Sequence, residues 1–256
     1  MSPHDIEIAC PPYRGEFGHM VMWHAPWFNA LDGKKLIVCE KGYEPLYPSA
    51  DIGIDTVEKP DGARREWTKY DQEEIDRWKH RLTRICPNAT IVEPPVKHPE
   101  SSTHLKYFQP MPDLAKDGPD IVVCPRYRDY GEVKNWEHWR YVAHRLIDRG
   151  KNVLAVGKGG ATADCGIGTV YGLAGAIRAM RRGGVVVATD SGLAHLAVMC
   201  GTQLLLIGDN GNTAPGYGPI KMKRFERANH RHATIVLIDG WNHPDRVISK
   251  AMDMDL

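Results

Sequence analysis

The sequence predicts an α/β protein built as two doubly wound domains, each around a parallel β-sheet. Along most of the chain, short apolar runs alternate with longer segments whose apolar residues recur at helical spacing. That alternation is typical of parallel strands covered by helices on both faces. A proline-rich stretch over residues 93–119 interrupts it, so we expect a first domain at residues 1–118 and a second at residues 119–256.

The first domain is expected to open with a strand, a loop and a helix. Residues 6–10 form an apolar run that ends at Pro11 and Pro12, as a buried strand does when it enters a loop. After the loop, apolar residues recur at helical spacing over residues 20–30, and Pro26 should kink or restart this helix.

The rest of the first domain adds three strands and one long helix. An apolar run at residues 36–40 predicts a strand, and alternating apolar residues at 52–57 predict a weaker one. A helix is expected over residues 71–85, because acidic residues open it and Pro87 stops it. Residues 90–92 supply the last short strand.

The second domain has a more regular pattern. Its predicted strands are the apolar runs at residues 120–124, 152–156, 185–188, 204–207 and 235–238. Its predicted helices cover residues 136–149, 171–181, 193–200 and 245–252. Gly150 and Gly201 follow two of these helices, as C-terminal caps do. The first helix is expected to bury the side chains of Trp139, Ala143, Leu146 and Ile147.

Composition predicts a soluble, cytoplasmic protein and excludes several other classes. The 256 residues are 42% hydrophobic and 25% charged, which excludes disordered, collagen-like and disulfide-rich chains. No apolar run approaches the roughly 18 residues that span a bilayer, and the N-terminus lacks a signal pattern. The six cysteines form no C-x-x-C pair, so we expect reduced, buried thiols and no zinc or redox site.

The two halves differ in charge. Residues 1–118 hold 15 basic and 19 acidic side chains, a net charge of −4, whereas residues 119–256 hold 18 and 13, a net charge of +5. A basic second domain suits an anionic ligand such as a nucleotide diphosphate. A chance imbalance between solvated faces explains the same numbers, so the charge difference indicates an anionic ligand only if a binding site is also found.

The loop over residues 189–192 is the segment with the clearest chemistry, because it joins an apolar strand directly to a helix. N–H groups at a helix start lack internal partners and the helix dipole adds positive charge, so such a loop can bind a phosphate. Gly192 would allow a close approach, and His195 would add a donor. In the alternative interpretation, Asp190 and Ser191 only cap the helix and His195 packs against it.

Residues 186–208 resemble a segment of glycosyltransferase family 9, the ADP-heptose:lipopolysaccharide heptosyltransferases. Their sequence, VVATDSGLAHLAVMCGTQLLLIG, follows the family pattern of apolar strand, D-[ST]-G-x-x-H, small-residue helix, G-T and apolar strand. The resemblance implies the GT-B fold, with two Rossmann-like domains facing across a cleft. It also implies that this segment binds the diphosphate of a nucleotide-sugar donor through Asp190, Ser191, Gly192, Leu193 and His195.

A second, weaker similarity lies in the loop after the first strand. Family members carry a Gly-Asp loop there, with the acid as catalytic base, and the Gly15-Glu16-Phe17-Gly18 loop resembles it with Glu in place of Asp. The resemblance implies that Glu16 is the general base and that Gly15, Gly18 and His19 lie on the acceptor side.

A third similarity lies over residues 124–146, where a polar loop precedes a tryptophan-containing helix start. The resemblance implies that the donor diphosphate contacts Arg126, Arg128 and Lys134. In the loop after the next strand, family members usually present an acidic residue to the donor ribose. Here the charged residues of that loop are Lys158 and Asp164, and Lys158 is the candidate donor contact.

Several histidines have two interpretations. His19 and His24 are alternative general bases, although a histidine beside Met and Trp residues is more often packed or hydrogen-bonded. His230 and His232 have the spacing of a strand edge, but no acidic or cysteine ligand accompanies them, so we predict no metal site.

Together these features predict an inverting, metal-independent glycosyltransferase that uses a nucleotide-sugar as co-substrate and no other cofactor. The acceptor is a saccharide or another hydroxyl-bearing substrate. One alternative acceptor is a hydroxylated base in nucleic acid, for which a basic cluster is available in Lys34, Lys35, Arg64 and Arg65. A separate alternative for the function of this chain is a non-catalytic nucleotide-sugar-binding protein of the same fold. A nicotinamide-dependent enzyme ranks last, since residues 157–162 do not complete G-x-G-x-x-G. The sequence does not indicate the oligomeric state.

Overall fold

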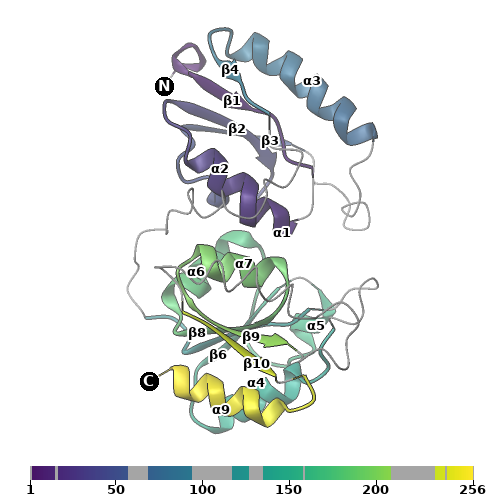
Figure 1. Ribbon diagram of the computed structural model, residues 1–256, viewed down its shortest axis with the longest axis vertical. Coiled ribbons are helices and arrows are strands. Elements are labelled where there is room, and N and C mark those ends of the chain that lie inside the picture. The colour runs from purple at the N-terminus through teal and green to yellow at the C-terminus, as the bar shows by residue number, and fades with distance from the viewer. Residues whose placement is uncertain are drawn as a thin grey trace. The chain divides into compact units, whose positions relative to one another are not determined.

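Two compact units make up the chain, Met1–Gln109 (unit 1) and Pro110–Leu256 (unit 2). They divide between Gln109 and Pro110, whereas the sequence places the domain boundary after residue 118. Each unit holds one parallel sheet (Figure 1). The structure is a computed structural model, and it describes residues 2–14, 17–56, 69–93, 117–126, 135–157, 159–208, 234–239 and 241–255. None of the helices in these ranges is long and apolar enough to cross a membrane.

Unit 1 is built on a four-stranded parallel sheet in the order β3-β2-β1-β4. Its strands are β1 (Ile8–Cys10), β2 (Lys35–Glu40), β3 (Ile52–Thr56) and β4 (Thr90–Ile91). β1 is an inner strand, with Ile8 opposite Lys35 of β2 and opposite Thr90 of β4. Because all pairs are parallel, the carboxyl ends of the four strands meet at one edge of the sheet.

Helices connect and cover these strands. After β1 the chain forms α1 (Phe17–His19), a π-helical turn (Met20–His24) and α2 (Ala25–Asn29). Pro26 lies in the first turn of α2, where its missing N–H is tolerated, so the predicted restart of the helix is confirmed. The long helix α3 (Lys69–Ile85) packs Trp78 and Leu82 against the sheet and ends before Pro87. Short 3₁₀ turns lie at Pro3–Asp5 and Glu44–Leu46.

Unit 2 is built on a six-stranded parallel sheet in the order β10-β9-β8-β5-β6-β7. Its strands are β5 (Ile121–Cys124), β6 (Val153–Val156), β7 (Thr169–Val170), β8 (Val185–Thr189), β9 (Gln203–Gly208) and β10 (Ile235–Asp239). The chain adds β6 and β7 on one side of β5 and then returns to add β8, β9 and β10 on the other. This is the Rossmann order, and its topological switch point lies between β5 and β8.

Two layers of helices cover the six-stranded sheet (Figure 1). α4 (Trp139–Asp148) and α9 (Pro244–Met254) lie side by side on one face, and α6 (Leu173–Arg182) and α7 (Gly192–Met199) lie on the other. α5 (Gly160–Ala163) is a single turn after β6. Every residue of β5 and β8 is buried, as expected of inner strands covered on both faces. The predicted α/β class with parallel sheets is confirmed.

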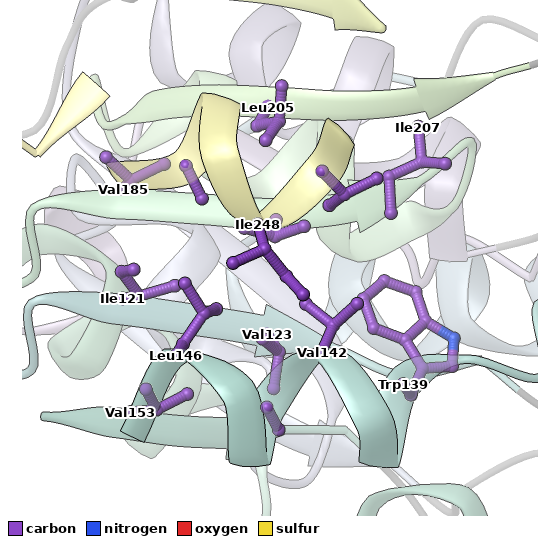
Figure 2. Packing of buried hydrophobic residues seen from close by; sticks show 14 of the residues in the cluster. Ile121, Val123, Trp139, Val142, Leu146, Val153, Val185, Leu205, Ile207 and Ile248 are labelled. Carbon is purple, nitrogen blue, oxygen red and sulfur yellow. The ribbon is translucent and has the colours of Figure 1, made fainter. Parts of the chain in front are cut away.

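A hydrophobic core of unit 2 fills the space between the sheet and the α4/α9 layer. Figure 2 shows Ile248 of α9 in front of the strands, near Val142 and Leu146 of α4. Alternate residues of the inner strands point into this core, which includes Ile121, Val123, Val185, Leu205 and Ile207. The residues between them face the α6/α7 layer, because successive side chains of a strand point to opposite faces.

The buried face of α4 differs from the predicted one at one position. Trp139, Ala143 and Leu146 are buried as predicted, but Ile147 is 40% exposed and Val142 takes the inward place. The helical period explains the difference, since Ile147 lies about 100° around the helix from Leu146. Gly150 ends the helix as predicted, with a φ of 82°.

Gly150 and the residue after it form a Schellman motif. The N–H of Gly150 donates to the carbonyl of Ile147 at 2.8 Å, and the N–H of Lys151 donates to the carbonyl of Leu146 at 3.2 Å. These bonds satisfy two of the last carbonyls of α4 and turn the chain into β6.

Replacing Leu146 with alanine should lower the free energy of unfolding by about 2–5 kcal/mol, because a fully buried side chain leaves a cavity. The matched control is Ile147→Ala, one residue further along the same helix, whose effect should stay within about 1 kcal/mol. Urea unfolding followed by tryptophan fluorescence measures both variants. Equal losses of stability would contradict the buried face assigned to α4.

Candidate functional site

The candidate site of unit 2 lies where the carboxyl ends of β5 and β8 meet. Cys124 pairs with Ala188 in the parallel register, so the residues that follow each strand emerge next to each other. Those residues are Pro125 and Arg126 after β5 and Asp190 and Ser191 after β8. In open parallel sheets, ligands bind outside the carboxyl ends of the strands at this switch point.

Ser191 caps the helix that starts at this edge. It has extended backbone angles (φ −151°, ψ 168°), and its hydroxyl accepts a hydrogen bond from the N–H of Ala194 at 3.4 Å. The capping interpretation of Ser191 is therefore confirmed. The cap uses one of the four N–H groups that a helix start leaves without intrahelical partners, so the first turn of α7 retains donors for an anion.

Asp190 and His195 form a pair beside this helix start. His195 Nε2 lies 3.8 Å from Asp190 Oδ1, and the two side chains are 9% and 6% exposed. The interaction is an ion pair only when His195 is protonated. The carboxylate therefore lies close to the imidazole at the start of α7, which Gly192 and Leu193 open.

The loop after β6 packs against the end of β5. A Cβ added to Gly157 would lie 2.5 Å from Thr162 Oγ1 and 3.3 Å from the carbonyl oxygen of Pro125. A larger residue at position 157 would therefore push apart the loops that follow β5 and β6. Arg126, two residues after β5, is half-buried. Of the other predicted donor contacts, Arg128, Lys134 and Lys158 lie outside the described residues.

The predicted acceptor side lies in unit 1, at the carboxyl end of β1. Gly15 and Glu16, the predicted base, lie outside the described residues, whereas Gly18 and His19 belong to α1. The described residue nearest to Glu16 on its N-terminal side is Arg14.

Arg14 forms a buried polar network that sequence reasoning missed. Its Nε donates to Glu74 Oε2 at 2.9 Å, its Nη2 contacts Glu74 Oε1, and its Nη1 donates to Glu40 Oε1 at 3.4 Å. Thr56 Oγ1 also donates to Glu74 Oε1, at 3.3 Å. Glu40 and Thr56 end β2 and β3, so the network lies at the same edge of the sheet as the loop after β1. No sequence motif signals it, because the partners come from separate elements.

His24, an alternative base, is a buried structural residue. Its Nδ1 lies 2.8 Å from the Tyr47 hydroxyl and its Nε2 lies 3.7 Å from Cys10 Sγ. Burial lowers the pKa of His24 to about 3 and raises that of the Cys10 thiol above its ordinary value. A histidine with so low a pKa is a weak proton acceptor at neutral pH, so the packed interpretation is correct.

Lys35 does not belong to a basic surface, contrary to the cluster predicted for nucleic-acid binding. Its ammonium group is buried and donates to the carbonyls of Phe28 and Asn29 at 3.4 and 3.1 Å. These carbonyls end α2, where a cation is favourable. Burial lowers the pKa of Lys35, although Asp32 and Asp51 oppose the shift. Arg64 and Arg65 of the same cluster lie outside the described residues.

A metal site finds no support in the described part of the chain, where no three His, Cys, Asp or Glu side chains are grouped to hold an ion. The predicted non-ligands His230 and His232 lie outside that part. All six cysteines are free and buried, as predicted.

Comparison with known proteins identifies the fold. The sequence matches no protein-family model and no curated protein. Among solved structures, E. coli heptosyltransferase WaaC with ADP is similar with a TM-score of 0.57 at 13% identity, over 98% of this chain and 100% of that one. E. coli ADP-heptose lps heptosyltransferase II has a TM-score of 0.57 at 14% identity, over 98% of both chains.

A glycosyltransferase family 9 protein from Veillonella parvula DSM 2008 has a TM-score of 0.55 at 12% identity, over 98% of this chain and 90% of that one. The chain therefore has the fold of these glycosyltransferases. The resemblance carried by residues 186–208 is confirmed at the level of the fold.

The buried His24 leads to a specific pH dependence of stability. Its pKa falls from the ordinary value of 6.5 to about 3 in the folded chain, so between these pH values the unfolded chain binds a proton that the folded chain does not. The contribution of this group is complete above pH 6.5 and is lost as the pH falls toward 3, by up to about 1.4 kcal/mol per pH unit. His24→Gln should therefore lose stability less steeply than the wild type when urea unfolding is compared at pH 6.5, 5.5 and 4.5. Parallel profiles would contradict a neutral, buried His24.

Proposed function

We propose that this protein is a glycosyltransferase that moves a sugar from a nucleotide-sugar donor to an acceptor hydroxyl, without a metal ion and with inversion at the anomeric carbon. The observation that carries the proposal is the Asp190-Ser191-Gly192 loop, which opens α7 at the switch point of the six-stranded sheet. A fold shared with a heptosyltransferase structure that contains ADP supports it.

In this proposal the donor diphosphate binds at the N-terminus of α7. The N–H groups of Gly192 and Leu193 and the helix dipole stabilise its negative charge, and His195, restrained by Asp190, donates a further hydrogen bond. Basic residues of the neighbouring loops add positive charge, and the candidates are Arg126, Arg128, Lys134 and Lys158. This charge replaces the metal that a diphosphate leaving group otherwise needs.

The transfer itself is a single displacement. The acceptor oxygen attacks the anomeric carbon, the bond from that carbon to the diphosphate breaks, and the diphosphate leaves with the electron pair. Glu16 takes the proton of the acceptor hydroxyl as general base, and Gly15, Gly18 and His19 line the acceptor side. One displacement on the face opposite the leaving group inverts the anomeric centre.

The acceptor is proposed to be a saccharide or another hydroxyl-bearing molecule. The burial of Lys35 removes one of the four residues that favoured a base in nucleic acid. A mass-shift assay on hydroxymethylated DNA tests that second acceptor. A rise in the mass of the DNA would identify a nucleic-acid base, and not a saccharide, as the acceptor.

Asp190→Ala should weaken nucleotide binding at least about tenfold, or about 1.4 kcal/mol, because His195 loses its partner at the helix start. Isothermal titration with ADP, ADP-heptose, ADP-glucose, UDP-glucose and GDP-mannose measures the effect. The control is Asp253→Ala, which removes the same charge from an exposed position of α9. If the wild type bound none of these compounds, or if Asp190→Ala bound them as tightly as the wild type does, the donor site would be wrong.

Glu16→Gln should lower turnover about 10²- to 10⁴-fold and leave nucleotide affinity within about twofold, because it removes a proton acceptor and keeps the side-chain size. Release of nucleoside diphosphate from the donor that binds best, measured in EDTA, reports both turnover and independence from metal. NMR of the product reports the anomeric configuration. Binding without turnover in the wild type would instead indicate a non-catalytic nucleotide-sugar-binding protein.

A further inference from the structure

Three buried polar side-chain atoms in the described part of the chain have no hydrogen-bond partner, and all three belong to unit 2. They are Trp139 Nε1, Thr162 Oγ1 and Thr189 Oγ1. Trp139 begins α4 after β5, Thr162 lies in α5 after β6, and Thr189 ends β8. Because β8, β5 and β6 are neighbours in the sheet, these residues lie at its carboxyl edge, around the switch point.

Thr189 and Trp139 face the same layer of unit 2. Side chains alternate along β8, so Thr189 points to the same face as Val185 and Val187, which belong to the core beneath α4 and α9. Trp139 belongs to that core too. Figure 2 shows Trp139 at the end of the core where Ile207 lies, and Ile207 is the partner of Thr189 in the parallel register. The two unpartnered atoms therefore belong to the same end of the same layer.

The start of α4 adds further hydrogen-bond donors at this end. Its N-cap residue, His138, makes no side-chain cap hydrogen bond, and no acidic side chain lies in the first turn. The first N–H groups of the helix and its dipole favour a group that accepts hydrogen bonds and carries negative charge. The indole N–H of Trp139 can only donate, and the Thr189 hydroxyl can donate as well. A phosphate oxygen satisfies all of these groups.

Stability alone explains these polar atoms poorly. A buried polar group that forms no hydrogen bond carries its whole desolvation penalty, and folded proteins seldom leave one unpaired. Valine has nearly the shape of threonine without the hydroxyl, and phenylalanine lacks the indole N–H of tryptophan, so apolar residues would avoid the penalty at both positions. A ligand group that supplies the missing acceptor explains why polar atoms are present beside the Asp190-Ser191-Gly192 loop.

We propose that Thr189 and Trp139 bind a phosphate oxygen of the donor diphosphate on the α4 side of β8, an inference that rests on the proposed function. The oxygen accepts from Thr189 Oγ1 and Trp139 Nε1, and it enters from the carboxyl edge of the sheet. Because α7 covers the opposite face, the diphosphate spans the end of β8. One phosphate binds at the N-terminus of α7, and the other binds beside Thr189.

Thr189→Val tests the hydroxyl, because it keeps the side-chain shape and removes the polar atom. Without ligand, the variant should have a thermal midpoint about 2–4 °C above that of the wild type, since an unpartnered buried group has gone. It should bind the phosphates about tenfold more weakly or worse, since a hydrogen bond to a charged oxygen is lost. Isothermal titration measures affinity for ADP, UDP and GDP and for inorganic pyrophosphate, which lacks the nucleoside and should lose the same factor.

Thr202→Val is the matched control. Thr202 is also buried in unit 2, but its hydroxyl donates to the carbonyl of Met180 at 2.7 Å, and it precedes β9 at the opposite edge of the sheet. This variant should lower the thermal midpoint by about 2–4 °C, because it breaks that bond, and leave affinity within about twofold. Trp139→Phe removes the second donor of the site and should weaken phosphate binding in the same direction as Thr189→Val.

The outcomes separate this inference from the proposed function. If the wild type binds a nucleoside diphosphate and Thr189→Val binds it as tightly, or if that variant is less stable than the wild type, the inference is overturned and the glycosyltransferase stands. A loss of nucleotide binding without a loss of pyrophosphate binding would assign the contact to the nucleoside and overturn the inference as well. Pyrophosphate binding with the expected loss, but no nucleotide binding, supports the phosphate contact and overturns the proposed function. If the wild type binds none of these compounds, both are overturned.

Discussion

The parallel hydrogen bonding between β5 and β8 is the interaction on which the candidate donor site depends. Cys124 and Ala188 are partners in this register although 64 residues separate them in the chain. Their pairing places the residues that follow both strands, Arg126 and Asp190 among them, at one edge of the sheet, where α7 also begins. Because both strands are buried on two faces, a slip of one residue would exchange the side chains that face the two helix layers. The core that holds the register therefore also holds the site.

The two units present different groups at the edge of the sheet where the strands have their carboxyl ends. In unit 2 the backbone supplies the chemistry: a helix start, capped by Ser191 and followed by Gly192, offers N–H donors and a partial positive charge. In unit 1 side chains supply it, through the buried contacts of Arg14 with Glu40 and Glu74. The first arrangement suits an anionic leaving group. The second joins the loop after β1 to a strand and a helix of unit 1.

The local elements were predictable because local patterns determine them. Pro26 restarts a helix, Pro87 follows one, and Gly150 closes another in a Schellman motif, all with short-range causes. The pattern of apolar residues was less informative where tertiary packing determines whether a strand forms or which side chain is buried. β7 has two residues and no apolar run, and it forms because it pairs with β6: the N–H of Ala155 donates to the carbonyl of Gly168, the residue before β7, at 2.9 Å. Val142 takes the place predicted for Ile147 in the core, where it shares one cluster with Val247 and Ile248 of α9.

The sequence by itself determined the α/β class, the parallel strands and the Asp190-Ser191-Gly192 loop, because each is a feature of consecutive residues. Only the tertiary structure decided which distant residues share an edge. It joined Arg14 to Glu74 and Glu40, and it paired Cys124 with Ala188 at the edge where α7 begins. The physical reason is that the hydrogen bonds of a parallel sheet join strands that are far apart in the chain. The partners of a buried charge are thus set by strand order and register, which no local pattern contains.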